Sequence, residues 1–181
     1  MCSSDLKRKN LAIHLDGARI FNAATQLRMK VKDLCAGFDS VSSCLSKGLG
    51  APAGTVLLGN SEFIQKAKRA RKILGGGMRQ AGVIAAAGLY ALENNVERLQ
   101  EDHANAEKLA RGLRELKLDV QLNTNMALVK LPPEKVSALA QHLKRQNILV
   151  LPRAPMRLVT HLDVDAAGID RALAGFRAFF S

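Results

Sequence analysis

Short apolar runs of strand length alternate with segments of helical periodicity along this chain, and this alternation limits its fold more than any other feature. The first apolar run, residues 11–15, ends at Asp16-Gly17, where the chain must turn. Later runs predict strands over 40–45, 55–58, 120–122, 127–131, 148–151 and 157–160. Helical spacing predicts helices over 18–27, 61–74, 80–116, 134–146 and 165–179, the last capped by Asp163 or Asp165. This order is typical of an α/β fold.

A composition shift at the glycines of residues 75–77 divides the chain. We expect part of a sheet-based domain over residues 1–77, a long connecting helix over 78–117 and a small α/β domain over 118–181. Residues 83–92 are apolar nearly all round, so we expect them to be buried, together with the strand at 55–58. The first run reads as a central parallel strand, yet few strands surround it, so the first domain looks incomplete.

The overall composition excludes several classes of protein. The chain has 181 residues, of which 48% are hydrophobic and 24% charged, as in ordinary globular proteins rather than disordered ones. No apolar run approaches the roughly 18 residues that a membrane span needs, and residues 1–10 lack the apolar core of a secretory signal. We therefore expect a soluble, cytoplasmic protein with no membrane partner.

The chain carries 27 basic and 16 acidic residues, a net charge of +11. A solvated helix face accounts for the densest basic cluster, which is Lys66, Lys68, Arg69, Arg71 and Lys72. Aromatic residues make up 4% of the chain and no nucleic-acid motif is present, so we expect no nucleic-acid partner and keep such binding as the weakest hypothesis.

Cysteine and histidine usage gives no sign of a metal site or of a disulfide framework. The three cysteines, Cys2, Cys35 and Cys44, form no C-x-x-C pair, and the four histidines form no H-E-x-x-H pair. We expect no bound metal.

One lysine, Lys47, follows a strand of small residues and precedes a glycine-rich stretch, residues 48–54. Glycine leaves the backbone open to the close approach of a ligand. Apolar surroundings would favour the neutral, nucleophilic form of the amine, as covalent catalysis by lysine requires. An ordinary loop lysine in a glycine-rich turn explains the same pattern, and spacing alone favours that simpler reading.

A second candidate stretch is residues 14–19, His-Leu-Asp-Gly-Ala-Arg. Asp16 ends a strand, which is where ligands bind in open α/β sheets, and a buried aspartate there could hold a protonated ring nitrogen. Arg19 could reach a carboxylate or a phenolate oxygen through its fork of donors. His14 shares the strand face of Asp16, but a core histidine is the favoured reading.

Taken together, these stretches resemble the low-specificity L-threonine aldolases, which are pyridoxal-phosphate enzymes of the aspartate-aminotransferase fold type and of the β-eliminating lyase group. The motifs that carry the resemblance follow one another from about residue 11 onward: HLDGARIFNAA (14–24), SVSSCLSKGLGAPAGTVLLG (40–59), RKILGGGMRQAGVIAAAGLYAL (71–92), RLQEDHANAEKLA (98–110) and RLVTHLDV (157–164).

The resemblance implies pyridoxal 5'-phosphate as the cofactor and a role for each of five residues. Lys47 matches the Schiff-base lysine, and Asp16 matches the partner of the pyridine nitrogen. Arg19 matches an arginine near the cofactor hydroxyl and the substrate carboxylate, and Arg157 matches the arginine that grips that carboxylate. Arg79 resembles the arginine that reaches the cofactor phosphate across a subunit interface, although a structural arginine would explain it too.

The resemblance further implies an aldehyde lyase that cleaves L-threonine or L-allo-threonine, small β-hydroxy amino acids, to glycine and acetaldehyde, and a homo-oligomer, dimer or tetramer, in the complete enzyme. Family members are considerably longer, with a phosphate-binding loop and a ring-stacking histidine in an N-terminal half that has no counterpart here. We therefore expect a C-terminal portion of such an enzyme, incomplete as a catalyst. The alternative is a catalytically silent fragment or interaction subunit that pairs with a full-length homologue.

Overall fold

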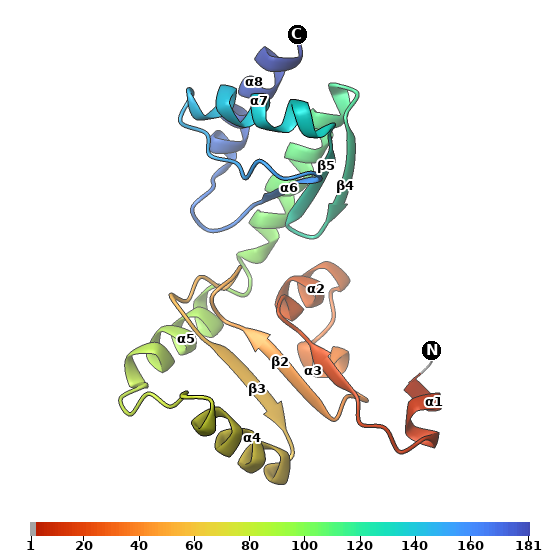
Figure 1. Ribbon diagram of the computed structural model, residues 1–181, viewed down its shortest axis with the longest axis vertical. Coiled ribbons are helices and arrows are strands. Elements are labelled where there is room, and N and C mark those ends of the chain that lie inside the picture. Colours follow the sequence, from red (N-terminus) through yellow and green to blue (C-terminus); the bar gives the residue numbers. More distant parts are fainter. Residues whose placement is uncertain (1–2) are drawn as a thin grey trace. The chain divides into compact units, whose positions relative to one another are not determined.

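The computed structural model describes residues 3–181, so Cys2 lies outside the described residues. The chain folds as two compact units, Met1–Glu97 and Arg98–Ser181 (Figure 1). The boundary between them falls inside residues 78–117, the range predicted as one connecting helix. Among the described residues, no helix is long and apolar enough to cross a membrane.

The first unit is built on a three-stranded sheet in the order β1-β2-β3. Strand β1 runs parallel to β2, while β2 and β3 are antiparallel (Figure 1). The strands are β1 (His14–Asp16), β2 (Ser40–Cys44) and β3 (Thr55–Gly59). The helices are α1 (Ser3–Arg8), α2 (Ile20–Leu27), α3 (Val31–Leu34), α4 (Ser61–Ile73) and α5 (Gly82–Asn94).

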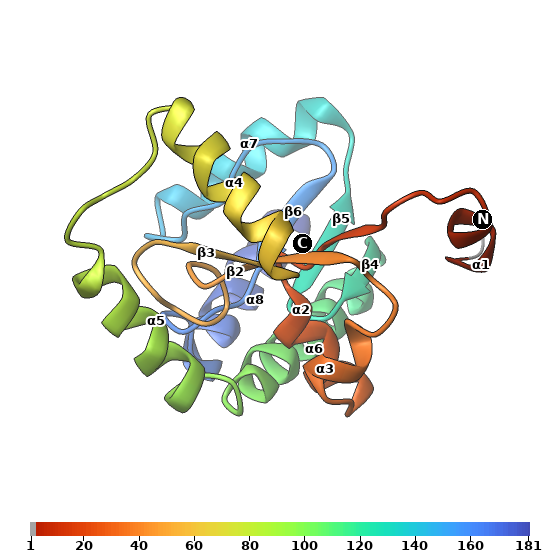
Figure 2. The same cartoon turned by 90° about the horizontal axis from the view of Figure 1, so that it is seen from below.

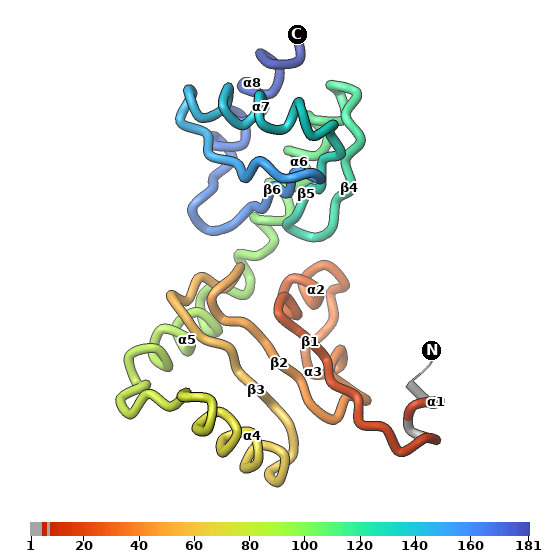
Figure 3. The backbone as a smooth tube through the Cα atoms, in the orientation of Figure 1, coloured from red at the N-terminus to blue at the C-terminus, as the bar shows by residue number. Residues whose placement is uncertain are grey.

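The second unit contains an antiparallel sheet in the order β4-β5-β6 (Figure 3). Its strands are β4 (Asp119–Asn123), β5 (Met126–Lys130) and β6 (Met156–Val159). Its helices are α6 (Leu99–Glu115), α7 (Pro133–Lys144) and α8 (Ala166–Phe180). Of the two predicted caps, Asp163 and Asp165, it is Asp165 that caps α8, because its Oδ1 accepts a hydrogen bond from the backbone N–H of Gly168 at 2.7 Å.

Alternation along the strands of the second unit directs one set of side chains into a closed core. Ala127, Val129 and Met156 are fully buried, and the cross-strand partner of Val129 on β4, Val120, joins them. The helices complete this core with buried residues that include Leu113, Leu139, Leu143, Leu173 and Phe176. This unit therefore buries its apolar residues as a small α/β domain should.

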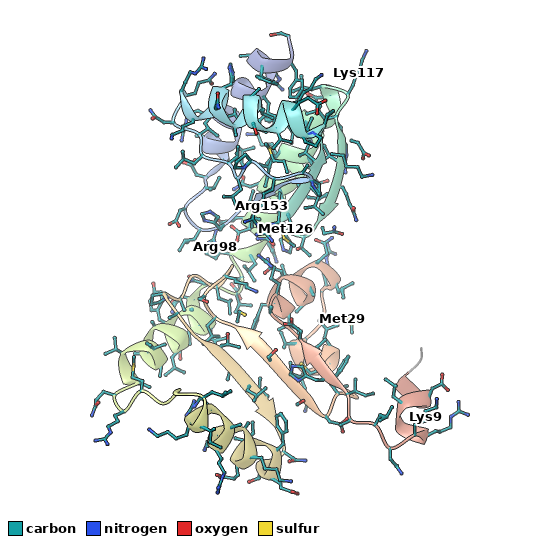
Figure 4. All side chains as sticks on the ribbon, in the orientation of Figure 1. Lys9, Met29, Arg98, Lys117, Met126 and Arg153 are labelled. Carbon is teal, nitrogen blue, oxygen red and sulfur yellow. The ribbon has the colours of Figure 1, made fainter. Side chains whose placement is uncertain are left out.

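The first unit leaves much of its apolar surface exposed, and two predictions of burial are wrong. All five residues of β3 are exposed, whereas a buried strand was expected at 55–58. On α5, Val83 is 82% exposed, and Gly88 and Ala91 are the buried residues of the helix. The reason is that no layer covers these elements within residues 3–181. In Figure 4, side chains fill the space between the helices and strands of the second unit, while α4 and α5 carry side chains that project outward.

Two secondary-structure predictions also need correction. The helix expected over residues 80–116 is two helices, because α5 ends at Asn94 and α6 begins at Leu99. An asparagine side chain competes for a backbone group there: Asn94 Nδ2 donates to the carbonyl of Tyr90 in the last turn of α5 at 2.9 Å. Residues 148–151 form no strand, since the N–H of Ile148 caps α7 through the Leu143 carbonyl.

Candidate active site

Parallel pairing brings the carboxyl ends of β1 and β2 to one edge of the first unit's sheet. The register places His14 opposite Ser40 and Asp16 opposite Ser42. Lys47 comes three residues after the end of β2. The loop that follows β2 leaves the sheet at this same edge (Figure 1). Strands β1 and β2 thus carry Asp16 and the Lys47 loop at neighbouring strand ends, which is where open α/β sheets bind ligands.

The turn after Asp16 is held tightly against β2. The N–H of Gly17 donates to the Ser42 carbonyl at 2.8 Å, and the N–H of Ala18 donates to Asp16 Oδ1 at 3.2 Å. A Cβ at position 17 would lie 2.8 Å from the same Ser42 oxygen, so this contact requires glycine. The expectation of a buried aspartate is wrong: the Asp16 side chain is exposed, because β1 is an edge strand within residues 3–181.

The loop that carries Lys47 is closed by its own backbone hydrogen bonds. Gly50 N–H donates to the Lys47 carbonyl at 2.8 Å, and Leu45 N–H donates to the Gly54 carbonyl at 3.0 Å. Gly50 and Gly54 adopt φ values of +76° and +119°, which side chains other than glycine rarely allow. The glycine-rich sequence therefore shapes a loop of fixed form.

Helix α5 packs against this loop and supports it, although no sequence motif indicates that role. A Cβ at Gly88 would lie 2.8 Å from Leu45 Cδ1, so the helix approaches the loop closely. Asn95 adds a hydrogen bond from its Nδ2 to the Leu49 carbonyl at 2.7 Å. Lys47 itself is exposed, while Leu45 and Leu49 are buried, so the expected apolar surroundings of its amine are not found.

Two other residues of the 14–19 stretch lie beside this edge. Arg19 precedes α2 as its N-cap residue, and its Nε is buried without a hydrogen-bond partner among the described residues. His14 is exposed, and its Nδ1 lies 2.9 Å from Ser40 Oγ. The reading of His14 as a core histidine is therefore wrong, and an unsatisfied guanidinium donor remains at the start of α2.

Arg157 belongs to the second unit, on β6, where it pairs in register with Leu128. Its side chain is exposed and lines a cavity of about 700 Å³ together with His161, Asp163 and Arg171. The cavity lies between residues 146–151, the end of β6 and the start of α8.

A buried polar network anchors the segment that follows Arg157. Thr160 Oγ1 donates to the Asp102 carbonyl at 2.6 Å, and Asn125 Nδ2 donates to the Thr160 carbonyl at 2.8 Å. The Asp102 carboxylate is fully buried and pairs with Arg98 at 2.7 Å. Sequence reasoning missed this network, because its members lie far apart along the chain and form no motif.

Arg79 is exposed in the connection between α4 and α5. That connection, residues 74–81, lies apart from the loop after β2 in Figures 1 and 2, so the structure does not bring it to the edge formed by β1 and β2. Among residues 3–181, no group of three His, Cys, Asp or Glu side chains could hold a metal ion.

Known proteins are similar to this chain in sequence and in fold. The low-specificity L-threonine aldolase of Escherichia coli O157:H7 is 49% identical over 97% of this chain, and a structure from Listeria monocytogenes assigned to the L-allo-threonine aldolases has a TM-score of 0.81 at 20% identity. A structure of a variant of S. paucimobilis serine palmitoyltransferase with a bound PLP–myriocin aldimine has a TM-score of 0.74 at 18% identity. These likenesses confirm the expected fold class, a portion of the fold-type-I architecture of PLP enzymes.

Each match covers nearly all of this chain but only part of the other protein. The chain spans 53% of the E. coli aldolase, 54% of the L. monocytogenes chain and 48% of the palmitoyltransferase chain. It thus spans about half the length of the curated relatives it matches. The family model for the β-eliminating lyases matches residues 5–132, well over half of the sequence, and the chain therefore belongs to the β-eliminating lyase family.

Proposed function

We propose that this chain supplies the lysine-bearing part of a carbon–carbon lyase that cleaves L-threonine or L-allo-threonine to glycine and acetaldehyde. The observation that carries the proposal is the placement of Asp16 and the Lys47 loop at neighbouring ends of two parallel strands. A chain 49% identical to an E. coli threonine aldolase supports the substrate class. Residues 1–77 would contribute to cofactor binding, and residues 118–181 would contribute to substrate binding. Residues 78–117 would link these two parts of the chain.

Pyridoxal phosphate is the cofactor of this family, and the residues present fit it. The buried Arg19 Nε lacks a hydrogen-bond partner among the described residues, and Arg19 follows Asp16 by three residues at the start of α2. Lys47 would hold the cofactor through Nζ, Asp16 would face its ring nitrogen, and Arg19 would face its hydroxyl. When bound, the cofactor withdraws electrons from the α-carbon of an amino acid, so that a bond at this carbon can break.

The chain's own residues would position the substrate and keep one proton in place. The Asp16 carboxylate would hold a proton on the ring nitrogen that it faces, because a negative charge nearby favours the protonated form. The Arg157 guanidinium would bind the substrate carboxylate through two parallel N–H donors, which fixes the orientation of the amino acid.

A homo-oligomer, dimer or tetramer, would complete the site in the whole enzyme. The connection that carries Arg79 lies apart from the Lys47 loop in Figures 1 and 2, which favours a role of Arg79 toward the phosphate of another subunit. The second candidate function is a catalytically silent subunit that pairs with a full-length homologue. The exposed strand β3 and the half-length match favour it as the alternative.

Chemical trapping separates these two functions. The chain is mixed with pyridoxal phosphate, reduced with borohydride and mapped by peptide mass spectrometry. We expect the pyridoxyl group on Lys47, with Lys47→Arg as the variant that loses it and Lys66→Arg as the matched control on an exposed lysine. If the label is spread over surface lysines and Lys47 is unmodified, Lys47 does not bind the cofactor. The catalytically silent subunit is then the remaining function.

Turnover tests the remaining roles. We expect little or no acetaldehyde release from L-allo-threonine by this chain alone, because catalysis needs a fixed cofactor geometry. In an enzyme that also contains the portion of the relatives with no counterpart in this sequence, Asp16→Asn should lower kcat, while Arg157→Lys should mainly raise KM. Normal kcat in the Asp16→Asn variant would contradict the role of the carboxylate.

A further inference from the structure

The second unit contains a cavity of about 700 Å³, and two arginines line it from different elements. Arg157 reaches the cavity from β6, and Arg171 reaches it from α8. Its volume lies within the range of small-molecule sites, about 300–1,000 Å³. All residues that line the cavity belong to the second unit, whose core is closed, so the first unit contributes nothing to its walls.

The guanidinium groups of both arginines are without protein partners. Among residues 3–181, neither Arg157 nor Arg171 forms a side-chain hydrogen bond or an ion pair. The Arg171 guanidinium lies near the first turn of α8, since its Nη2 is 3.6 Å from the place that a Cβ at Gly168 would take. A guanidinium carries its N–H donors in a planar fork that matches the two oxygens of a carboxylate. Each arginine can therefore bind a carboxylate of its own.

The lining also contains two carboxylates, Asp163 and Asp165, which do not neutralise these arginines. Asp165 Oδ1 accepts the hydrogen bond from the Gly168 N–H at 2.7 Å. The Asp163 side chain is 84% exposed, so water screens its charge, and its Oδ2 lies 3.5 Å from His161 Nδ1. Neither aspartate forms an ion pair with one of the arginines. The cavity therefore favours a ligand with negative charge at more than one point.

Helix α6 holds the connection between the two arginines in a fixed form. At the start of this connection, Thr160 Oγ1 donates to the Asp102 carbonyl at 2.6 Å. Close to its end, Asn105 Nδ2 donates to the Val164 carbonyl at 3.1 Å. Strand β6 and helix α8 are thus tied to the same helix, and the backbone positions that carry the two arginines are set before a ligand arrives. Groups that are ordered in advance lose less entropy on binding.

We propose that this cavity binds a small dicarboxylate, with one carboxylate on Arg157 and the other on Arg171. The inference rests on the proposed function in one respect, since Arg157 there binds the α-carboxylate of an amino acid. The second carboxylate then belongs to the side chain of the substrate, and Arg171 is a specificity-determining residue. The substrate class thus extends from L-threonine to β-hydroxy amino acids whose side chain ends in a carboxylate.

Cleavage of such a substrate needs no reagent beyond those of the proposed reaction. In 3-hydroxyaspartate the bond between the α-carbon and the β-carbon breaks, and its electron pair stays with the α-carbon. The β-hydroxyl loses its proton as the carbonyl of glyoxylate forms. The α-carbon takes up a proton, which gives glycine, so that all atoms and electrons of the substrate appear in the two products.

A titration of the full chain without cofactor tests the site. The probes are L-aspartate, which carries two carboxylates, and L-asparagine, in which an amide of the same shape replaces the second one. We expect L-aspartate to bind about tenfold more tightly, because one further charge-assisted pair separates the two ligands. Added salt should narrow the difference. Equal affinities in calorimetry, or no binding of L-aspartate, would overturn the proposal.

Matched variants locate the second carboxylate. Arg171→Gln should weaken binding of L-aspartate about tenfold and leave binding of L-asparagine unchanged. Arg177→Gln is the control, since Arg177 is an exposed arginine of the same helix and lies outside the lining of the cavity. It removes the same charge from α8, and circular dichroism checks that both variants fold as the parent does. Equal losses of L-aspartate affinity in the two variants would overturn the assignment to Arg171.

The trapping experiment on Lys47 separates a failure of this proposal from a failure of the proposed function. A preference for L-aspartate that Arg171→Gln abolishes, without a pyridoxyl label on Lys47, would keep the dicarboxylate site and contradict the proposed function. A label on Lys47 without this preference would keep the proposed function and overturn the dicarboxylate site.

Discussion

The two units of this chain differ in what their apolar residues contact. In the second unit, Leu139, Leu143 and Phe176 are fully buried between the helices and the sheet. In the first unit, Val83, Leu89 and the residues of β3 face outward. The second unit is thus a closed domain, while the first is a set of elements around the loop that carries Lys47. A segment can therefore carry candidate site residues without containing the residues that would close a hydrophobic core around them.

Truncation of a large apolar side chain to alanine should give the largest difference between the two units in the free energy of unfolding. Phe176→Ala should lower the free energy of unfolding by about 3–5 kcal/mol, because it removes a fully buried ring and leaves a cavity. Leu89→Ala in the first unit should change it by less than about 0.5 kcal/mol, since this side chain is already exposed. Urea unfolding monitored by hydrogen exchange in each unit measures both, and a large loss in Leu89→Ala would break the comparison.

Removal of one ion pair from each unit should give the next largest difference in the free energy of unfolding. Arg98→Ala should cost about 3 kcal/mol, because it leaves the fully buried Asp102 carboxylate without its charged partner. Lys66→Ala removes an exposed pair with Glu62 on α4 and should cost less than about 0.5 kcal/mol. Denaturant midpoints of the two variants check this, and near-equal shifts would show that burial does not set the strength of these pairs.

The sequence alone predicts much of the structure of the second unit, but it predicts little of how the elements of the first unit pack. Strand alternation around Val129 and the cap at Asp165 follow local rules, so the sequence sufficed for them. The exposure of Val83 depends on what covers α5, and no local pattern carries that information. In the same way, the motif around Lys47 marked the loop, but its support by Gly88 arises from a contact distant in sequence. The network of Asp102, Asn125 and Thr160 was invisible for that reason.

Neighbouring asparagines give a smaller contrast within the first unit. Asn95→Ala should cost about 1 kcal/mol and speed hydrogen exchange in residues 45–54, because it removes the hydrogen bond to the Leu49 carbonyl. Asn94→Ala is the control, since Asn94 Nδ2 bonds to the Tyr90 carbonyl within its own helix. If both variants leave the loop equally protected, α5 does not support it through this bond.

The smallest expected effect is a pH dependence in the second unit. Burial lowers the pKa of His103 from 6.5, and this effect exceeds the opposing attraction of Asp102. Below pH 6.5 the unfolded chain therefore takes up the proton first, so the free energy of unfolding falls as the pH drops through the folded pKa. His103→Gln should flatten this slope. An unaltered slope in urea titrations of the variant would assign the pH dependence to other groups.

The contact of Gly17 with β2 has a consequence for how such sequences can drift. The Ser42 carbonyl oxygen receives the Gly17 N–H at 2.8 Å, and any Cβ at position 17 would lie equally close to it. A contact between main-chain atoms therefore sets the distance between the strand that ends at Asp16 and the strand that leads to Lys47. A side-chain exchange at another position leaves the two main-chain groups of this hydrogen bond in place, while a single added methyl at position 17 would push them apart.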